Sequence, residues 1–99
     1  MTDAPVHVVA RLVPRPGQAE ALAASVRAIL PQVRDEPGCL AYVAHESCET
    51  PGVLVMVETW ADQVALDAHA VAPAFTTLAA RFDELLAQPP VIERLRRID

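Results

Sequence analysis

A carboxylate, an indole and an imidazole lie close together in the second half of the chain. Glu58 and Trp60 are two positions apart in one segment, and His69 follows nine residues after Trp60. If residues 53–60 form a strand and a short helix folds back over it, these side chains converge on one pocket. A flat aromatic wall beside two proton-holding groups suits a planar apolar substrate that undergoes proton transfer. Glu58 and His69 are therefore candidate catalytic residues, and Trp60 is a candidate substrate contact.

Each of these residues also has a purely structural interpretation. Trp60 is the single tryptophan, and large aromatic side chains commonly lie in the core. Glu58, near the end of a strand, can be solvated or can pair with Arg11 or Arg81. His69 is flanked by alanines, where a buried histidine often serves structure alone. The three residues by themselves leave both interpretations open.

Three further residues are candidate substrate contacts. Met56 shares a strand face with Glu58 and Trp60, because side chains alternate along a strand. Tyr42, the single tyrosine, follows a Pro-Gly turn and faces either the pocket or a subunit interface. Phe75 lies on the apolar face of a later helical segment. The candidate lining is therefore Met56, Tyr42 and Phe75 beside Trp60.

Other chemistries find little support in the sequence. His7 and His45 fall on different predicted strands without clustered Asp, Glu or Cys, so we expect no metal site. The three glycines are far apart, which argues against a phosphate-binding loop for a nucleotide or flavin. No Gly-x-Ser-x-Gly nucleophile motif is present. Cys39 and Cys48 lie at opposite ends of one predicted strand segment, so we expect two free thiols.

Apolar periodicity predicts the elements that position these side chains. A helix extends to about Arg34, with a kink or loosened last turn at Pro31. Asp62 can cap a short helix that continues to about Ala70, and Pro73 suits the first turn of a further helical piece. That piece places on one face Phe75, Leu78, Ala79, Phe82, Leu85 and Leu86. Strands are predicted at residues 6–13, 39–46, 53–60 and, more weakly, 91–98.

The order β-α-β-β-α-β predicts a single ferredoxin-like α+β domain over residues 1–99, with an antiparallel four-stranded sheet. Both helical regions of this plan cover the same face of the sheet. The apolar run 53–57 nevertheless indicates a strand that is buried on both faces. A second copy of the same sheet would cover the other face, so we expect a homodimer.

Composition and charge limit the classes of partner and the cellular locations that we expect for this protein. The chain is 53% hydrophobic and 21% charged, with a formal net charge of −5. Its eight basic residues are all arginines and are scattered, which argues against a nucleic-acid partner. No apolar run reaches the length of a membrane span, and residues 1–5 lack the features of a signal peptide. We therefore expect a cytoplasmic protein that does not bind membranes.

The sequence resembles the antibiotic biosynthesis monooxygenase family, small dimeric α/β-barrel proteins that include quinol and anthrone monooxygenases. The resemblance implies a ferredoxin-like fold, a homodimer with facing sheets, and a pocket between sheet and helices. It also implies oxygenation of a small phenolic, quinol or anthrone-like aromatic by dioxygen without flavin, haem or metal. The matching segments are Val9-Ala10-Arg11, Pro16-Gly17, Glu36-Pro37-Gly38-Cys39-Leu40-Ala41-Tyr42, Val57-Glu58-Thr59-Trp60, Leu66-x-x-His69 and the helix from Phe75 to Leu86.

The same resemblance implies roles for single residues and shows two departures. Trp60 would be a pocket wall, His69 a base or hydrogen-bond donor, and Glu58 a polar partner. Quinol-oxidising relatives often have a Pro-His pair where this chain has Pro73-Ala74. Haem-degrading relatives carry an asparagine where this chain has Ala10. The competing functions are a haem-binding or haem-degrading protein and a non-catalytic dimer that binds a small ligand.

Overall fold

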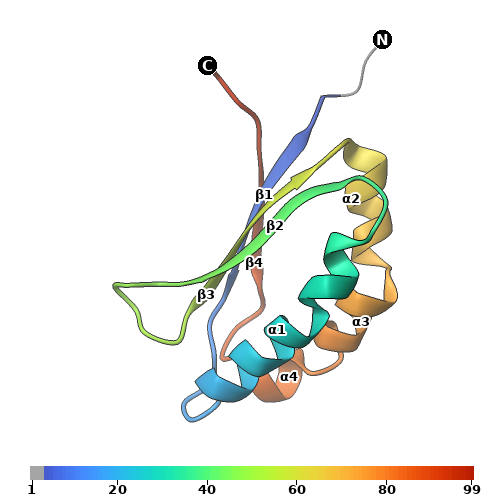
Figure 1. The fold of residues 1–99 in the computed structure, drawn as a ribbon. Helices are drawn as coiled ribbons and strands as arrows, with labels where there is room; N and C mark the ends of the chain where they lie inside the picture. The colour runs from blue at the N-terminus through green and yellow to red at the C-terminus, as the bar shows by residue number, and fades with distance from the viewer. Residues whose placement is uncertain (1–3) are drawn as a thin grey trace.

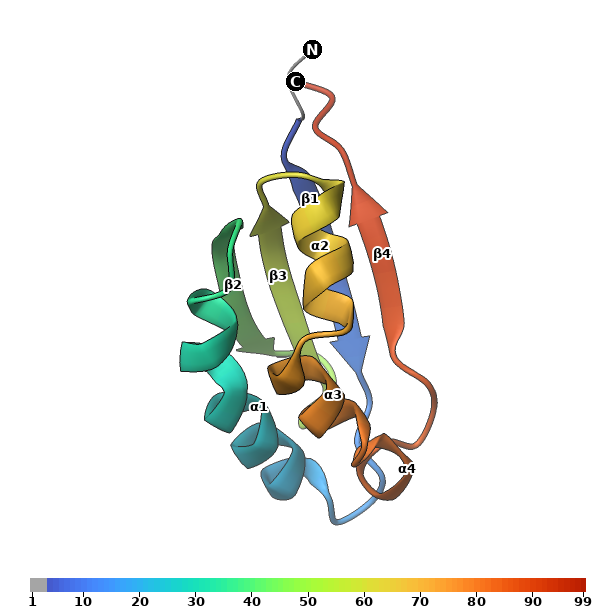
Figure 2. The same ribbon diagram turned by 90° about the vertical axis from the view of Figure 1, so that its right-hand side faces the viewer.

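The computed structural model describes residues 4–99, so Met1–Asp3, part of the segment weighed as a signal peptide, lie outside the described residues. The strands form one antiparallel sheet in the order β2-β3-β1-β4. The helices lie together on one face of this sheet (Figures 1 and 2). This arrangement confirms the predicted ferredoxin-like α+β fold. In chain order the elements are β1 (Val6–Leu12), α1 (Ala19–Arg34), β2 (Cys39–Glu46), β3 (Leu54–Trp60), α2 (Gln63–Ala70), α3 (Pro73–Ala79), α4 (Phe82–Leu85) and β4 (Val91–Leu95).

Two elements differ from the sequence prediction by more than one residue, and α1 agrees with it. The helical piece that begins at Pro73 is divided into α3 and α4, because the backbone N–H of Arg81 bonds to the carbonyl of Leu78, only three residues back. β4 ends at Leu95, three residues before the predicted end. α1 continues through Pro31, and the N–H of Asp35 lies 3.3 Å from the carbonyls of both Pro31 and Gln32. This shared, long bond fits the loosened last turn that was expected.

The core lies between the sheet and the helices. α1 buries one side chain per turn, as its spacing predicted, and α3 and α4 add Leu78 and Leu85. From the sheet, alternate residues of β1 and β3 face the helices, and Val8, Leu12 and Met56 are almost completely buried. Within residues 4–99, no helix combines the length and the apolarity that crossing a membrane requires.

The face of the sheet away from the helices is open in the single chain (Figure 1). Within the single chain Val57 is 45% exposed, so the predicted burial of residues 53–57 on both faces depends on a second copy and stays a prediction. Val57 pairs with Val43 on β2 and with Val9 on β1, so three valines form a row across this face. Val43 is equally exposed, at 45%. We call this row the open-face valines.

Candidate functional site

A cavity of about 340 Å³ lies between the inner face of the sheet and the helices, and we call it the inner cavity. Its floor includes a row of paired residues, Tyr42 on β2, Glu58 on β3, Val8 on β1 and Arg94 on β4. Most of the lining is apolar, as in sites for small organic ligands. Five of the six candidate residues from the sequence line it, namely Tyr42, Met56, Glu58, His69 and Phe75.

His69 reaches the cavity from the last turn of α2. The Asp62 side chain caps this helix by accepting a hydrogen bond from the N–H of Ala65 at 2.8 Å, as the sequence predicted. The imidazole is buried among aromatic rings, with its centroid 4.6 Å from the indole of Trp60, 5.6 Å from Tyr42 and 5.5 Å from Phe75.

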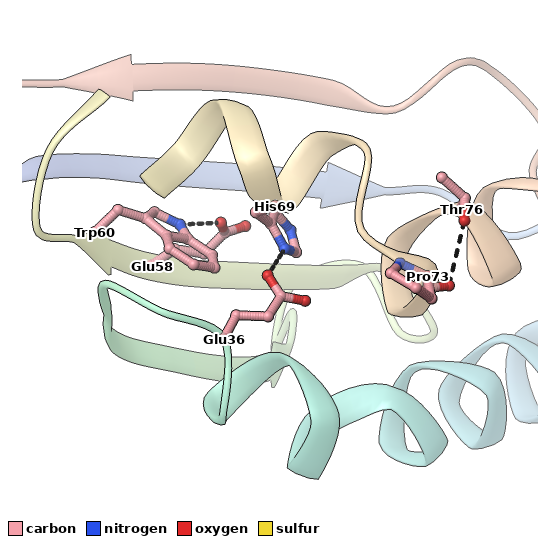
Figure 3. A network of polar contacts seen from close by, with 6 residues as sticks. All are labelled: Glu36, Glu58, Trp60, His69, Pro73 and Thr76. Atoms are coloured by element: carbon pink, nitrogen blue, oxygen red, sulfur yellow. Dashed lines mark hydrogen bonds and ion pairs between the residues drawn. The ribbon is translucent and has the colours of Figure 1, made fainter. Parts of the chain in front are cut away.

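Glu58 is held by its neighbour on the same strand face. The indole Nε1–H of Trp60 donates to Oε1 of Glu58 at 2.9 Å, and both side chains are buried (Figure 3). Burial raises the pKa of the Glu58 carboxyl above its ordinary value. The alternative of a pairing with Arg81 is wrong, because Arg81 bonds instead to Glu84 and Ser25.

Trp60 is buried in the core instead of forming a wall of the inner cavity. Its side chain is 0% exposed, and it is not among the described residues that line the inner cavity. It packs against His69, with 30° between the two ring planes, and its centroid lies 6.4 Å from that of Tyr42 in a T-shaped arrangement. The structure therefore places Trp60 behind the residues that a ligand would touch, and the predicted direct contact stays a prediction.

Glu36 is a site residue to which the sequence reasoning assigned no role. Its Oε1 lies 2.9 Å from Nδ1 of His69, and the two side chains are 13% and 7% exposed (Figure 3). The loop between α1 and β2 carries Glu36 to this place, and Gly38 in the same loop lies against the start of α2. The only sequence signal was the Glu36-Pro37-Gly38 segment, which carried part of the family resemblance.

A second space also borders His69, and we call it the outer pocket. It also measures about 340 Å³ and is bounded by Glu36, Gly38, Asp62, Ala65 and Ala72, among others. Val64 and Ala68, which also border it, are exposed, so the pocket opens at the protein surface. Among the described residues, His69 alone borders both the inner cavity and the outer pocket.

Polar side chains at one edge of the inner cavity were also missed. Nη1 of Arg94 on β4 donates to Oε1 of Gln63 on α2 at 2.8 Å, and Nε2 of Gln63 donates to Oδ1 of Asp67 at 2.8 Å. All three residues line the cavity. They were missed because nothing in the sequence indicates that the edge strand β4 lies beside the first turn of α2.

The remaining titratable candidates lie apart from this centre. His7 and His45 lie on the open face of the sheet, where Nδ1 of His7 contacts Oγ1 of Thr59 at 3.2 Å. Cys39 and Cys48 are free thiols, as predicted. Burial, followed by the nearby carboxylates of Glu36 and Glu58, raises the pKa of Cys39, which disfavours a reactive thiolate.

The chain belongs to the antibiotic biosynthesis monooxygenase family, whose family model matches residues 5–81. This confirms the family to which the sequence motifs pointed.

Relatives match along almost the whole chain. A Mycobacterium tuberculosis protein named "Putative monooxygenase Rv0793" is 37% identical over 95 residues, which cover 96% of this chain and 93% of that protein. The solved structure of Rv0793 has a TM-score of 0.90 at 36% identity, with 97% of each chain covered. The crystal structure of PA3566 from Pseudomonas aeruginosa has a TM-score of 0.91 at 31% identity, covering 100% of this chain and 99% of that one.

Proposed function

We propose that this protein is a cofactor-independent monooxygenase that oxygenates a small phenolic, quinol or anthrone-like aromatic with dioxygen. The observation that carries the proposal is the inner cavity, an apolar space of about 340 Å³ in which His69 and Glu58 are buried polar groups. Family membership supports the reaction class, and the apolar lining supports an aromatic substrate. The cofactor-independent route is the one that the family resemblance implies.

The proposed reaction begins with proton removal by His69. The resulting substrate anion is rich enough in electrons to reduce dioxygen, and a carbon–oxygen bond then forms. One oxygen atom enters the product and the other leaves as water, and all the electrons that reduce dioxygen come from the substrate. The protein contributes a position for the substrate, a dry surrounding and a group that takes the proton.

Glu58 has a separate part in this proposal. Because burial raises the pKa of its carboxyl, Glu58 holds a proton more readily than an exposed glutamate does. A protonated carboxyl in the floor of the cavity can donate a hydrogen bond to a substrate oxygen while Trp60 fixes its other oxygen. Tyr42, Met56 and Phe75 supply the apolar contacts.

A homodimer through the open sheet face belongs to the same proposal. The helices cover one face of the sheet, while Val43 and Val57 each leave 45% of their side-chain surface exposed on the other. A second copy of the sheet removes this apolar area from water, which favours association by about 25 cal/mol for each Å² buried. Face-to-face sheets are also the arrangement that the family resemblance implies.

Oxygen uptake by the purified, chelator-treated protein tests the reaction. The substrates are a panel of quinols, anthrones and flavonols, each corrected for its own autoxidation. We expect uptake by the wild type and a loss of about 10²- to 10⁴-fold in His69→Gln, the range for removal of a general base. His45→Ala, which removes a histidine from the exposed side of β2, should retain the wild-type rate if it sediments as the wild type does.

Other results would favour a different function or a different role for His69. Uptake that His69→Gln leaves unchanged would remove His69 from the reaction. Binding of the panel compounds without any uptake would favour a non-catalytic ligand-binding dimer. A haemin titration followed by absorbance examines the haem alternative, which Ala10 disfavours because it gives the cavity a methyl group where haem-degrading relatives carry an asparagine.

A further inference from the structure

We infer that Glu36 is a positioning residue that fixes His69 in one tautomer, with its proton on Nδ1 and an unprotonated Nε2 turned to the inner cavity. The link to catalysis rests on the proposed monooxygenase function, while the tautomer itself does not. Three observations carry the inference. They are the contact between the two side chains, the two spaces that His69 borders, and the close packing of the loop that holds Glu36.

The contact fixes where the proton lies. Oε1 of Glu36 is 2.9 Å from Nδ1 of His69, with both side chains largely buried. A carboxylate can only accept a hydrogen bond, so Nδ1 must donate, and the neutral ring then has its lone pair on Nε2. Glu36 borders the outer pocket and is not among the described residues that line the inner cavity, whereas His69 borders both, so we infer that the Nε2 edge is turned to the inner cavity.

The second carboxylate oxygen of Glu36 lacks a compensating partner while the His69 ring is neutral. In residues 4–99, Oε2 of Glu36 is the buried side-chain oxygen or nitrogen atom without a hydrogen-bond partner. An unpartnered buried carboxylate oxygen is costly, and an adjacent positive charge offsets that cost. The Nδ1 atom of His69 lies 2.9 Å from Oε1 of the same carboxylate. Glu36 is therefore placed to neutralise the charge that the ring gains when Nε2 takes a proton in the proposed reaction.

The other groups around His69 do not duplicate this role. Glu58 from β3 is engaged by the Trp60 indole, and Tyr42 from β2 presents the edge of its ring. Glu36 stays in place because Gly38 lies tightly against α2, where a Cβ at Gly38 would meet Cβ of Ala65 at 2.5 Å. The carbonyl of Gly38 also accepts from the N–H of Ala61 at 2.8 Å, which ties the loop to the end of β3.

Nitrogen-15 NMR of the histidine side chains tests the tautomer without any substrate. At alkaline pH the wild type should show His69, assigned by its loss in His69→Gln, with the proton on Nδ1. Glu36→Gln keeps the size of the side chain, but its amide group can donate to Nδ1, so we expect His69 to change to the Nε2–H form. Glu36→Leu, which offers no acceptor, should give the same change. Asp35→Asn, at the exposed neighbouring position, should leave His69 unaltered.

Kinetics of oxygen uptake test the consequence for the reaction. For Glu36→Gln we expect kcat to fall by about 10- to 100-fold, as for other groups that orient a functional histidine, while KM stays within about twofold. An Nε2–H tautomer in the wild type, or the same tautomer in all variants, would overturn the inference. A changed tautomer with unchanged kcat would overturn its catalytic part. If no substrate supports uptake, the proposed function fails, and the NMR still decides the positioning of His69.

Discussion

The imidazole of His69 packs against the indole of Trp60 at a tilt, with 4.6 Å between the ring centroids and 30° between the planes. The same indole donates its N–H to Glu58 at 2.9 Å. One buried tryptophan thus fixes both candidate catalytic side chains, one through its face and the other through its edge. Trp60 acts on the cavity through its neighbours, since it does not line the cavity among the described residues.

Replacing Trp60 should cost stability in two separable ways. Trp60→Ala should lower the free energy of unfolding by about 3–5 kcal/mol, enough to unfold a marginal domain. Trp60→Phe keeps most of the volume but removes the donor to Glu58, so we expect a loss of about 1–3 kcal/mol. Urea denaturation of both variants measures these losses.

A double-mutant cycle isolates the hydrogen bond between the two residues. In Trp60→Phe with Glu58→Leu, neither side chain leaves an unpaired polar atom, so the double variant should be more stable than the sum of the single losses implies. Strictly additive losses would mean that the Trp60–Glu58 bond contributes nothing beyond packing.

The raised pKa of Glu58 should make stability depend on pH. Burial raises this pKa above its ordinary value of 4.5, so between 4.5 and the raised value the folded chain binds more protons than the unfolded chain. The contribution of Glu58 is therefore fully present below pH 4.5 and is lost as pH rises through the folded-state pKa, at no more than about 1.4 kcal/mol per pH unit.

Glu58→Gln should remove this pH dependence. We expect its unfolding free energy, relative to that of the wild type, to increase as pH rises from 4.5 toward neutrality. Urea denaturation at a series of pH values provides the measurement. Glu49→Gln, at an exposed turn position, is the control and should follow the wild-type curve. Parallel curves for Glu58→Gln and the wild type would count against the raised pKa.

Gly38 should tolerate no side chain, for two reasons. Its φ of +81° is unfavourable for residues with a Cβ, and that Cβ would lie 2.5 Å from Cβ of Ala65. Gly17 has a nearly identical φ of +82° but open space around it, so Gly17→Ala reports the backbone strain alone. We expect Gly38→Ala to be less stable than Gly17→Ala by about 1–3 kcal/mol, the usual range for overpacking.

A compensating change checks the cause of that difference. Ala65→Gly removes the atom that a Cβ at position 38 would meet. Combined with Gly38→Ala, it should restore part of the stability, although glycine inside α2 itself costs about 1 kcal/mol. Thermal unfolding of the single and double variants measures this effect. If the double variant lost more stability than the two single variants together, the contact with Ala65 would be ruled out as the cause.

The proposed dimer depends on the open-face valines. Sedimentation of the wild type at micromolar concentration should give about twice the chain mass of 10.7 kDa. Val57→Glu places a charge in the middle of the row and should yield a folded monomer, because burying an unpaired carboxylate is costly. Val71→Glu, at a valine that is 76% exposed after α2, should remain dimeric. A monomeric wild type would contradict the proposed interface.

Most of the fold was predictable because it depends on local periodicity. Apolar residues at helical spacing located α1, and β-branched runs located β1 and β3. The turn residues Pro37-Gly38 and Pro51-Gly52 bounded the segment that forms β2. The convergence of Glu58 and His69 followed from the two-residue period of a strand and the short return of α2. How deeply a side chain is buried was harder to predict from the sequence. Strand alternation gives the face on which Trp60 lies, but how completely other elements cover that face is decided by tertiary packing.

The parts that were missed depend on contacts between distant segments. Glu36 and His69 are 33 residues apart, and they meet only because Gly38 lets one loop approach α2 closely. Likewise, an apolar run in β3 indicates that both faces avoid water, but it does not distinguish cover by the same chain from cover by a second one. Val57 illustrates this, because it belongs to the apolar run and is nevertheless half exposed in the single chain.

His69 borders both the inner cavity and the outer pocket, so truncating its side chain removes volume from the boundary of both spaces at once. His69→Ala should therefore admit more water to the inner cavity than His69→Gln, which fills most of the imidazole volume. Under the proposed reaction, the difference in oxygen uptake between these two variants measures what the exclusion of water contributes, separately from proton transfer.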